Sequence, residues 1–139
     1  PVQDIVKGKR IVICDDSIVR GTQLKNFTIQ KLKECGVKEI HLRIACPPLM
    51  FPCKFNYSTR SIHELAARKA IKAMEGKDID NVSPYLDENF PKYKKMVEWI
   101  AKDIGATTLK YQKLDDMVKA IGLAKDKLCL YCWTGKAPK

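Results

Sequence analysis

Residues 10–22 read Arg-Ile-Val-Ile-Cys-Asp-Asp-Ser-Ile-Val-Arg-Gly-Thr, and this stretch predicts both a fold class and a binding loop. Residues 10–14 form a continuous β-branched apolar run, which is typical of a strand covered on both faces in a parallel sheet. A helical pattern follows the loop and ends near Gly36, and an alternating run at residues 39–45 predicts a second strand. The sequence therefore predicts a β-α-β unit and an α/β fold.

Two amphipathic patterns predict which helical side chains pack against the sheet. On the helix between the two strands, one face carries Leu24, Phe27, Thr28, Leu32 and Cys35. On a later helix, which Gly105 ends, one stripe carries Met96, Val97, Ile100, Ala101 and Ile104. We expect both faces to be buried, because an amphipathic helix turns its apolar stripe toward the core.

The chain divides into three predicted parts. Residues 1–60 hold the β-α-β unit and the loop after its first strand. Residues 61–122 form a mainly helical extension with one short strand, and the spacing of Ser61 and Glu64 is that of a capping box, which predicts a helix beginning there. Residues 123–139 form a cysteine-containing tail.

The loop at residues 15–22 has residue types that suit a phosphorylated ligand with hydroxyl groups. Backbone N–H groups of the loop and of the following helical turn point to one place, where the helix dipole favours negative charge. Gly21 permits a close approach, and Ser17 and Thr22 offer hydroxyl donors. The two aspartates would repel a bare phosphate, but carboxylates accept hydrogen bonds from a diol and hold Mg²⁺. A ribose 5-phosphate fits this combination, whereas the simpler alternative is a solvent-exposed helix cap.

Composition narrows the possible binding partners and the subcellular location. The net charge is +10, from 26 basic and 16 acidic residues, but the lysines are scattered without an Arg-rich run or an aromatic platform, so nucleic acid is not expected as a partner. No apolar run is long enough for a membrane span, and the first residues lack a signal-peptide pattern. We expect a cytoplasmic address. Because Pro1 leads almost directly into a strand, we also expect the sequence to start inside a longer chain.

Cysteine spacing marks a second possible site. Cys129 and Cys132 form a C-x₂-C pair, which on its own is compatible with a metal site, with thiol redox chemistry or with simple burial. The cysteines expected to be small, buried core residues are Cys14, Cys35 and Cys46. His41 and His63 have no second ligand nearby in the sequence, and we expect them at the surface or at an interface.

Residues 12–22 resemble the phosphoribosylpyrophosphate motif of the type I phosphoribosyltransferases. With residues 6–9, residues 45–48 and the Pro-Cys pair that ends at Cys53, they are similar to the amidophosphoribosyltransferases in particular. The resemblance implies part of a type I phosphoribosyltransferase, with a Rossmann-like parallel sheet and a mainly helical C-terminal part. The chain departs from the family pattern at residues 54–58, and residues 69–102 are longer than the family leads us to expect.

The resemblance also assigns site residues. It implies that Asp15 and Asp16 hold the ribose hydroxyls and Mg²⁺. The residues that wrap the 5-phosphate would be Ser17, Ile18, Val19, Arg20, Gly21 and Thr22. A 4Fe-4S cluster is implied at Cys53, Cys129 and Cys132, with a fourth ligand upstream and Trp133 as a shield. No residue of the chain is expected to act as a base or nucleophile.

The implied activity is the synthesis of 5-phosphoribosylamine from phosphoribosylpyrophosphate and glutamine in purine synthesis. Glutamine would be used by an upstream glutaminase domain, so the chain alone is expected to be inactive, and the intact enzyme is expected to be a homo-oligomer. Two alternatives use the same loop: a module that senses phosphoribosylpyrophosphate without catalysis, and a salvage phosphoribosyltransferase that acts on a nucleobase.

Overall fold

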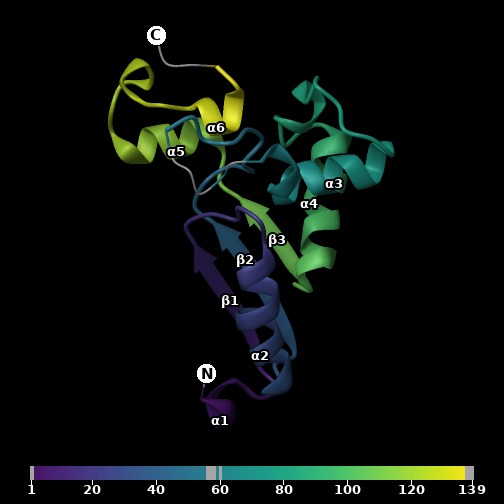
Figure 1. Ribbon diagram of the computed structural model, residues 1–139. Helices are drawn as coiled ribbons and strands as arrows, with labels where there is room; N and C mark the ends of the chain where they lie inside the picture. Colours follow the sequence, from purple (N-terminus) through teal and green to yellow (C-terminus); the bar gives the residue numbers. More distant parts are fainter. Residues whose placement is uncertain (1, 56–58, 60, 137–139) are drawn as a thin grey trace.

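The fold is built on a three-stranded parallel sheet, shown by a computed structural model that describes residues 2–55, 59 and 61–136. The strands β1 (Arg10–Asp15), β2 (Glu39–Ile44) and β3 (Thr108–Tyr111) lie in the order β1-β2-β3 (Figure 1). β1 and β2 pair residue by residue, from Arg10 opposite Glu39 to Asp15 opposite Ile44. The parallel α/β architecture predicted from the sequence is therefore confirmed.

Helices connect and extend the sheet. The main ones are α1 (Gln3–Val6), α2 (Gln30–Glu34), α3 (Ala66–Glu75), α4 (Pro91–Ile104), α5 (Leu114–Ile121) and α6 (Tyr131–Thr134). A π-helical segment, η1 (Leu24–Ile29), runs directly into α2, and the 3-10 turns are η3 (Ile62–Glu64), η4 (Ser83–Tyr85) and η5 (Lys125–Lys127). None of these helices is long and apolar enough to cross a membrane, as judged over the described residues.

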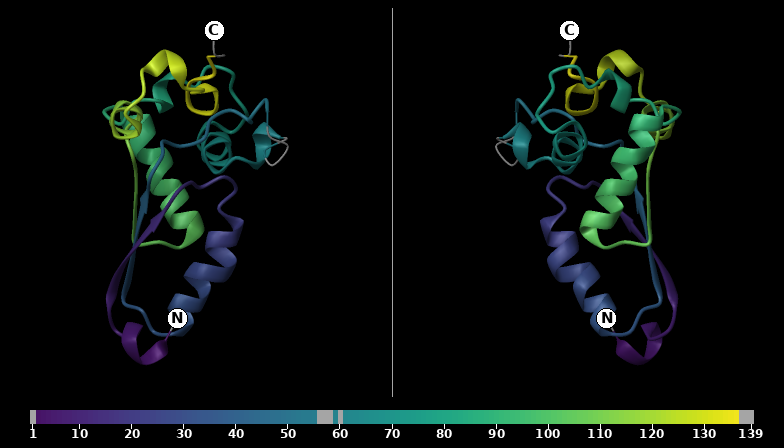
Figure 2. Two further views of the ribbon diagram at one scale, coloured as in Figure 1. Left: turned by 90° about the vertical axis from the view of Figure 1, so that its left-hand side faces the viewer. Right: turned by 90° about the vertical axis from the view of Figure 1, so that its right-hand side faces the viewer.

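The core lies between the sheet and the helices on one of its faces. In Figure 2, α2 and α4 lie on the same side of the three strands. From β2, the buried side chains are Ile40, Leu42 and Ile44, and from α4 they are Met96, Ile100, Ala101 and Ile104. The predicted stripe of α4 is thus confirmed except that Val97 is half-buried. Gly105 ends α4 with a left-handed φ of 87°, as expected for a C-cap glycine.

The expectation that β1 is covered on both faces is wrong. Val12 is 60% exposed, and Cys14 is exposed as well, so the core position expected for that cysteine is also wrong. The reason is positional: β1 is an edge strand, and α2 and α4 both cover the other face of the sheet. Of the other two cysteines expected in the core, Cys46 is buried and Cys35 is half-buried.

The face predicted for the helix after β1 is partly wrong. Phe27 is 62% exposed, whereas Ile29, which the pattern did not include, is 1% exposed. The cause is the π-helical segment, because its wider turn rotates every later residue relative to an ordinary α-helix. Leu24 and Leu32 lie in the core as predicted.

The helix expected to begin at Ser61 begins five residues later. The Ser61 hydroxyl does accept a hydrogen bond from the backbone N–H of His63 at 3.3 Å, as a cap would. Only the short turn η3 follows, however, because Leu65 has an extended backbone with ψ of 130° and α3 starts at Ala66. Glu64 therefore does not close a capping box at the start of a helix.

Replacing Ile104 by alanine is expected to lower the free energy of unfolding by about 2 to 5 kcal/mol, because the buried side chain would leave a cavity. The matched control is Ile121→Ala. Both residues end a helix before a glycine, but Ile121 is half-exposed, so its replacement should cost less than about 1 kcal/mol. Denaturant unfolding followed by circular dichroism measures both values, and equal losses would contradict the burial of Ile104.

Candidate functional site

The loop predicted to bind a ligand surrounds a cavity at the carboxyl end of β1. This cavity has a volume of about 550 Å³ and is lined by all eight residues of the loop, 15–22, together with Gln23 and Leu24. The last two belong to the first helical turn, whose N–H groups have no partner within the helix. The sequence could have predicted Gln23 and Leu24 as part of the site, because the helix pattern begins directly after Thr22. The position matches the general rule that open α/β sheets bind ligands at the carboxyl ends of their strands.

Gly21 lets the loop pack closely against α4. Its φ of +76° lies in the left-handed region, and a Cβ there would lie 3.3 Å from both Cγ1 and Cδ1 of Ile104. Ile18 is buried in the core next to it. A side chain at residue 21 would thus be strained by its backbone and crowded by α4, so the loop and α4 approach this closely only with glycine.

The two aspartates stand at the start of the loop. Asp15 Oδ1 accepts a hydrogen bond from the backbone N–H of Asp16 at 2.9 Å, and the carbonyl of Asp15 accepts one from Ala45 at 2.9 Å. Burial raises the pKa of Cys46 to about 11, and the charges of Asp16 and Asp15 add to this shift. Both carboxylates therefore lie near the end of β2 as well as β1, and both residues line the cavity.

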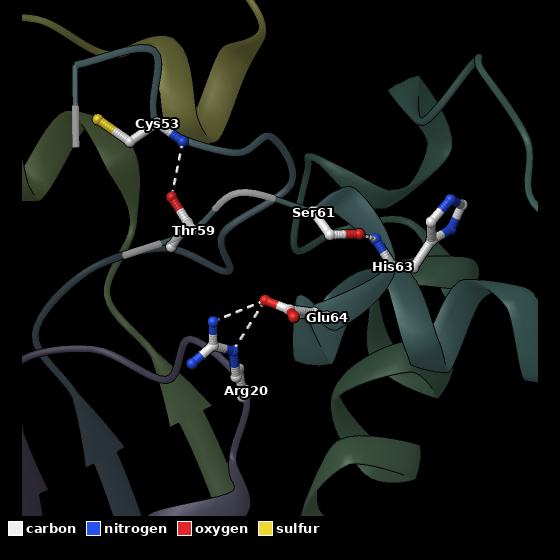
Figure 3. A network of polar contacts seen from close by, with 6 residues as sticks. All are labelled: Arg20, Cys53, Thr59, Ser61, His63 and Glu64. Atoms are coloured by element: carbon white, nitrogen blue, oxygen red, sulfur yellow. Dashed lines mark hydrogen bonds and ion pairs between the residues drawn. The ribbon is translucent and has the colours of Figure 1, made fainter. Parts of the chain in front are cut away.

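Arg20 forms an ion pair that the sequence pattern did not indicate. Its Nε and Nη2 atoms both donate to Oε2 of Glu64, at 2.9 and 2.7 Å (Figure 3). The backbone N–H of Ala66 donates to the carbonyl of Val19 at 2.8 Å, so the segment before α3 lies against the loop. No local signal could have predicted this contact, because the two side chains are 44 positions apart.

The cysteines of the tail lie beside the segment that follows β2. The carbonyl of Cys132 accepts hydrogen bonds from the N–H groups of Met50 and Phe51, at 2.9 and 3.0 Å. The pKa of Cys132 is raised to about 11. Burial is the largest cause, and the neighbouring thiols of Cys53 and Cys129 raise it further. The structure thus brings Cys53 and Cys132 within hydrogen-bonding reach. Among the described residues, however, no group of three or more His, Cys, Asp or Glu side chains is arranged to hold a metal ion.

Aromatic contacts hold the tail in the same place. The rings of Phe51 and Tyr131 lie 5.9 Å apart, and Nζ of Lys54 lies 4.4 Å from the ring centroid of Tyr131. The indole N–H of Trp133 is buried without a hydrogen-bond partner of good geometry, although it is close enough to Cys46 to lower the pKa of that thiol. Trp133 therefore anchors the tail by packing inward, against Cys46.

The two histidines form ordinary surface contacts. His41 lies between Glu39, at 3.0 Å, and the Thr108 hydroxyl, at 2.9 Å, on the open face of the sheet. His63 is exposed and pairs with Asp78 at 2.7 Å. Neither lines the cavity of the loop.

A second cavity, of about 530 Å³, lies under the tail. Its apolar lining includes Pro47, Met50, Tyr85, Leu114, Leu130 and Trp133. Among the described residues that line this second cavity there is neither a pair of adjacent carboxylates nor a glycine, unlike in the loop. The chemistry of a phosphorylated, hydroxyl-bearing ligand therefore favours the loop cavity, although the second cavity is the more apolar of the two.

Comparison with known proteins identifies relatives along the whole chain. The amidophosphoribosyltransferase of Methanocaldococcus jannaschii is 36% identical over 138 residues, which cover 99% of this chain and 23% of the relative. That of Pyrococcus horikoshii is 37% identical over 139 residues, covering 100% of this chain and 25% of the relative. The chain thus spans about a quarter of the length of these curated relatives. No family model matches it.

Solved structures show the same relationship. The glutamine phosphoribosylpyrophosphate amidotransferase of B. subtilis, solved with ADP and GMP, superposes with a TM-score of 0.66 at 34% identity, over 99% of this chain and 25% of that one. A structure described as the allosteric regulatory enzyme of purine biosynthesis gives a TM-score of 0.68 at 33% identity, with the same coverage. Since sequence and fold agree over nearly every residue, the chain belongs to the amidophosphoribosyltransferases and corresponds to a C-terminal portion of these enzymes.

Proposed function

We propose that this chain provides the ribose 5-phosphate site of an enzyme that makes 5-phosphoribosylamine from phosphoribosylpyrophosphate and glutamine. The observation that carries the proposal is the cavity lined without interruption by residues 15–24. It combines two carboxylates, a left-handed glycine and the start of a helix at the carboxyl end of a strand. The match to amidophosphoribosyltransferases extends through the tail, which favours this activity over a sensing module or a salvage enzyme.

Each part of the loop has a proposed task. Asp15 and Asp16 accept hydrogen bonds from the ribose hydroxyls, which orients the sugar. Residues 17–22 surround the 5-phosphate, with the N–H groups of the first helical turn directed at it and Arg20 at the rim. Holding the sugar by both ends fixes the position of its C1 atom, and positioning of this kind supplies much of the rate enhancement in a group transfer.

The two aspartates are also the residues that would hold Mg²⁺. They fit this role, because hard carboxylate oxygens are the ligands that Mg²⁺ prefers and both residues line the cavity. A bound Mg²⁺ would neutralise negative charge that grows on the departing pyrophosphate. The groups that bind pyrophosphate and use glutamine are not assigned to any described residue, so we propose that the chain alone does not complete the reaction.

We further propose that Cys53, Cys129 and Cys132 are ligands of an iron–sulfur cluster in the intact enzyme. Thiolates are the usual ligands of such clusters, and Cys132 already lies next to Cys53. The exposed Cys129 would complete the set from this chain, together with a ligand from elsewhere in the enzyme. Because the raised pKa keeps Cys132 protonated at neutral pH, loading the site should release protons and proceed more readily as the pH rises.

Ribose 5-phosphate is expected to bind to the chain in the presence of Mg²⁺ and to shift the amide resonances of Gly21 and Thr22. Asp16→Asn should weaken this binding at least tenfold, or by about 1.4 kcal/mol or more, because it removes a charged hydrogen-bond acceptor and a cation ligand. Asp116→Asn is the control, since it removes the same charge from an exposed position on α5. A nuclear magnetic resonance titration measures all three affinities, and an unchanged affinity in Asp16→Asn would exclude the proposed role.

Anaerobic reconstitution of the intact enzyme with iron and sulfide is expected to give a brown protein. Cys129→Ser should lose most of its bound iron, because serine is a poor ligand for the cluster. Cys14→Ser is the matched control, since Cys14 is equally exposed but lies on β1, and it should keep its iron. Iron content and the visible absorption spectrum report the result, and a colourless wild-type protein would refute the cluster.

A further inference from the structure

We propose that Glu64 is an internal competitor of the ligand phosphate for Arg20. In this view the Glu64 carboxylate occupies the guanidinium in the empty site, and an arriving phosphate displaces it. The inference rests on the proposed function, because it assumes that residues 15–22 bind a phosphate. It adds a specificity residue that lies outside the loop.

The geometry of the pair is that of an oxyanion bound to arginine. Nε and Nη2 of Arg20 form one edge of the guanidinium, and both donate to the same oxygen of Glu64, at 2.9 and 2.7 Å. An arginine binds a phosphate through the same edges, with two donors directed at the anion. Arg20 lines the cavity, so the carboxylate of Glu64 holds donors that a phosphate in the cavity would use (Figure 3).

Glu64 is held in this position by the backbone around it. On one side, the Ser61 hydroxyl accepts from the N–H of His63, whose ring pairs with Asp78. On the other side, the N–H of Ala66 donates to the carbonyl of Val19, and the side chain of Leu65 is fully buried. The turn η3 is thus anchored at both ends. The fold therefore places Glu64 beside the loop, within reach of Arg20.

The pair contributes little to stability. The side chains of Arg20 and Glu64 are 49% and 44% exposed, and ion pairs at such positions are weak because water screens them. A phosphate group carries more charge and more acceptor oxygens than a carboxylate, so it can replace Glu64 at little cost to the fold. The contact therefore suits a reversible exchange better than a structural bond.

Charge around the loop gives the exchange a consequence for specificity. Among the described residues that line the cavity, with Glu64 added as the partner of Arg20, the ionisable groups are the carboxylates of Asp15, Asp16 and Glu64 and the guanidinium of Arg20. Because Glu64 satisfies Arg20, a free anion meets a region of net negative charge. We therefore expect Glu64 to disfavour inorganic phosphate, and to favour ligands that arrive with a divalent cation to neutralise the aspartates.

The test is a nuclear magnetic resonance titration with inorganic phosphate, without divalent cations, that follows the amides of Gly21 and Thr22. Glu64→Gln keeps the size of the side chain and removes its charge, and it should bind phosphate about two- to fivefold more tightly than wild type. Glu88→Gln is the matched control. It breaks a pair with Lys113 of similar length and exposure, away from the loop, and should bind like wild type.

Each other outcome overturns the inference. Equal affinities of Glu64→Gln and wild type would show that Glu64 does not compete, and the phosphate loop would stand. Weaker binding in Glu64→Gln would mean that Glu64 positions Arg20 for the ligand. If inorganic phosphate shifts Gly21 and Thr22 in neither protein, the competition fails, whereas the proposed function fails only if ribose 5-phosphate with Mg²⁺ gives no shift either. Should Glu64→Gln not fold, Glu64→Ala is titrated in its place, and unfolding of both would assign the pair a structural role.

Discussion

The contact between Ile104 and Gly21 joins the core of this protein to its binding loop. Ile104 ends α4, which packs against the sheet, and it lies so close to the loop that a Cβ at residue 21 would be only 3.3 Å from its side chain. Ile18 enters the core from the same loop. The loop at residues 15–22 is thus supported by apolar packing on the side of the core, while the same residues line the cavity. A site built in this way is positioned by burial, which is the strongest force available to a small domain.

Charge and packing divide the work at the site. Packing sets where the backbone of the loop lies, while Asp15, Asp16 and the pair of Arg20 with Glu64 supply the charges to which we assign the choice of ligand. The tail follows the same division. Its position depends on main-chain hydrogen bonds to Cys132 and on the contact of Phe51 with Tyr131, which do not involve thiol chemistry. The contacts that hold the tail therefore leave the thiols of Cys129 and Cys132 out of its packing.

Much of this structure could be predicted from sequence periodicity and glycine positions. The strands, α4 with its buried stripe and α5 were all predictable, because each pattern is local and a glycine ends each of these two helices. The open face of β1 was not, since a β-branched run looks the same in a central and in an edge strand. Ile29 is buried in place of Phe27 because of a π-helical turn, and this turn has no clear sequence signal.

The site divides in the same manner. Its loop is contiguous in the sequence, so its residue types could be interpreted together and its cavity was predictable. The role of Glu64 was not, because a capping-box spacing describes only the nearest four residues. Its actual partner is distant in the chain and is brought near by the way the segment before α3 crosses the loop. Contacts of this kind depend on the tertiary fold and are invisible to a local pattern.

The topology of the sheet also sets the order in which the site can form. β1 and β2 are joined by a short helical crossover, but β3 pairs with β2 through residues such as His41 and Thr108, which are 67 positions apart. Closing so long a segment costs entropy before its contacts form, so β3 and α4 should join late in folding. Because Ile104 belongs to that late part, the loop acquires its support only in the last step. A nascent chain would hold all of residues 15–22, but without the contact between Ile104 and Gly21 until α4 has docked.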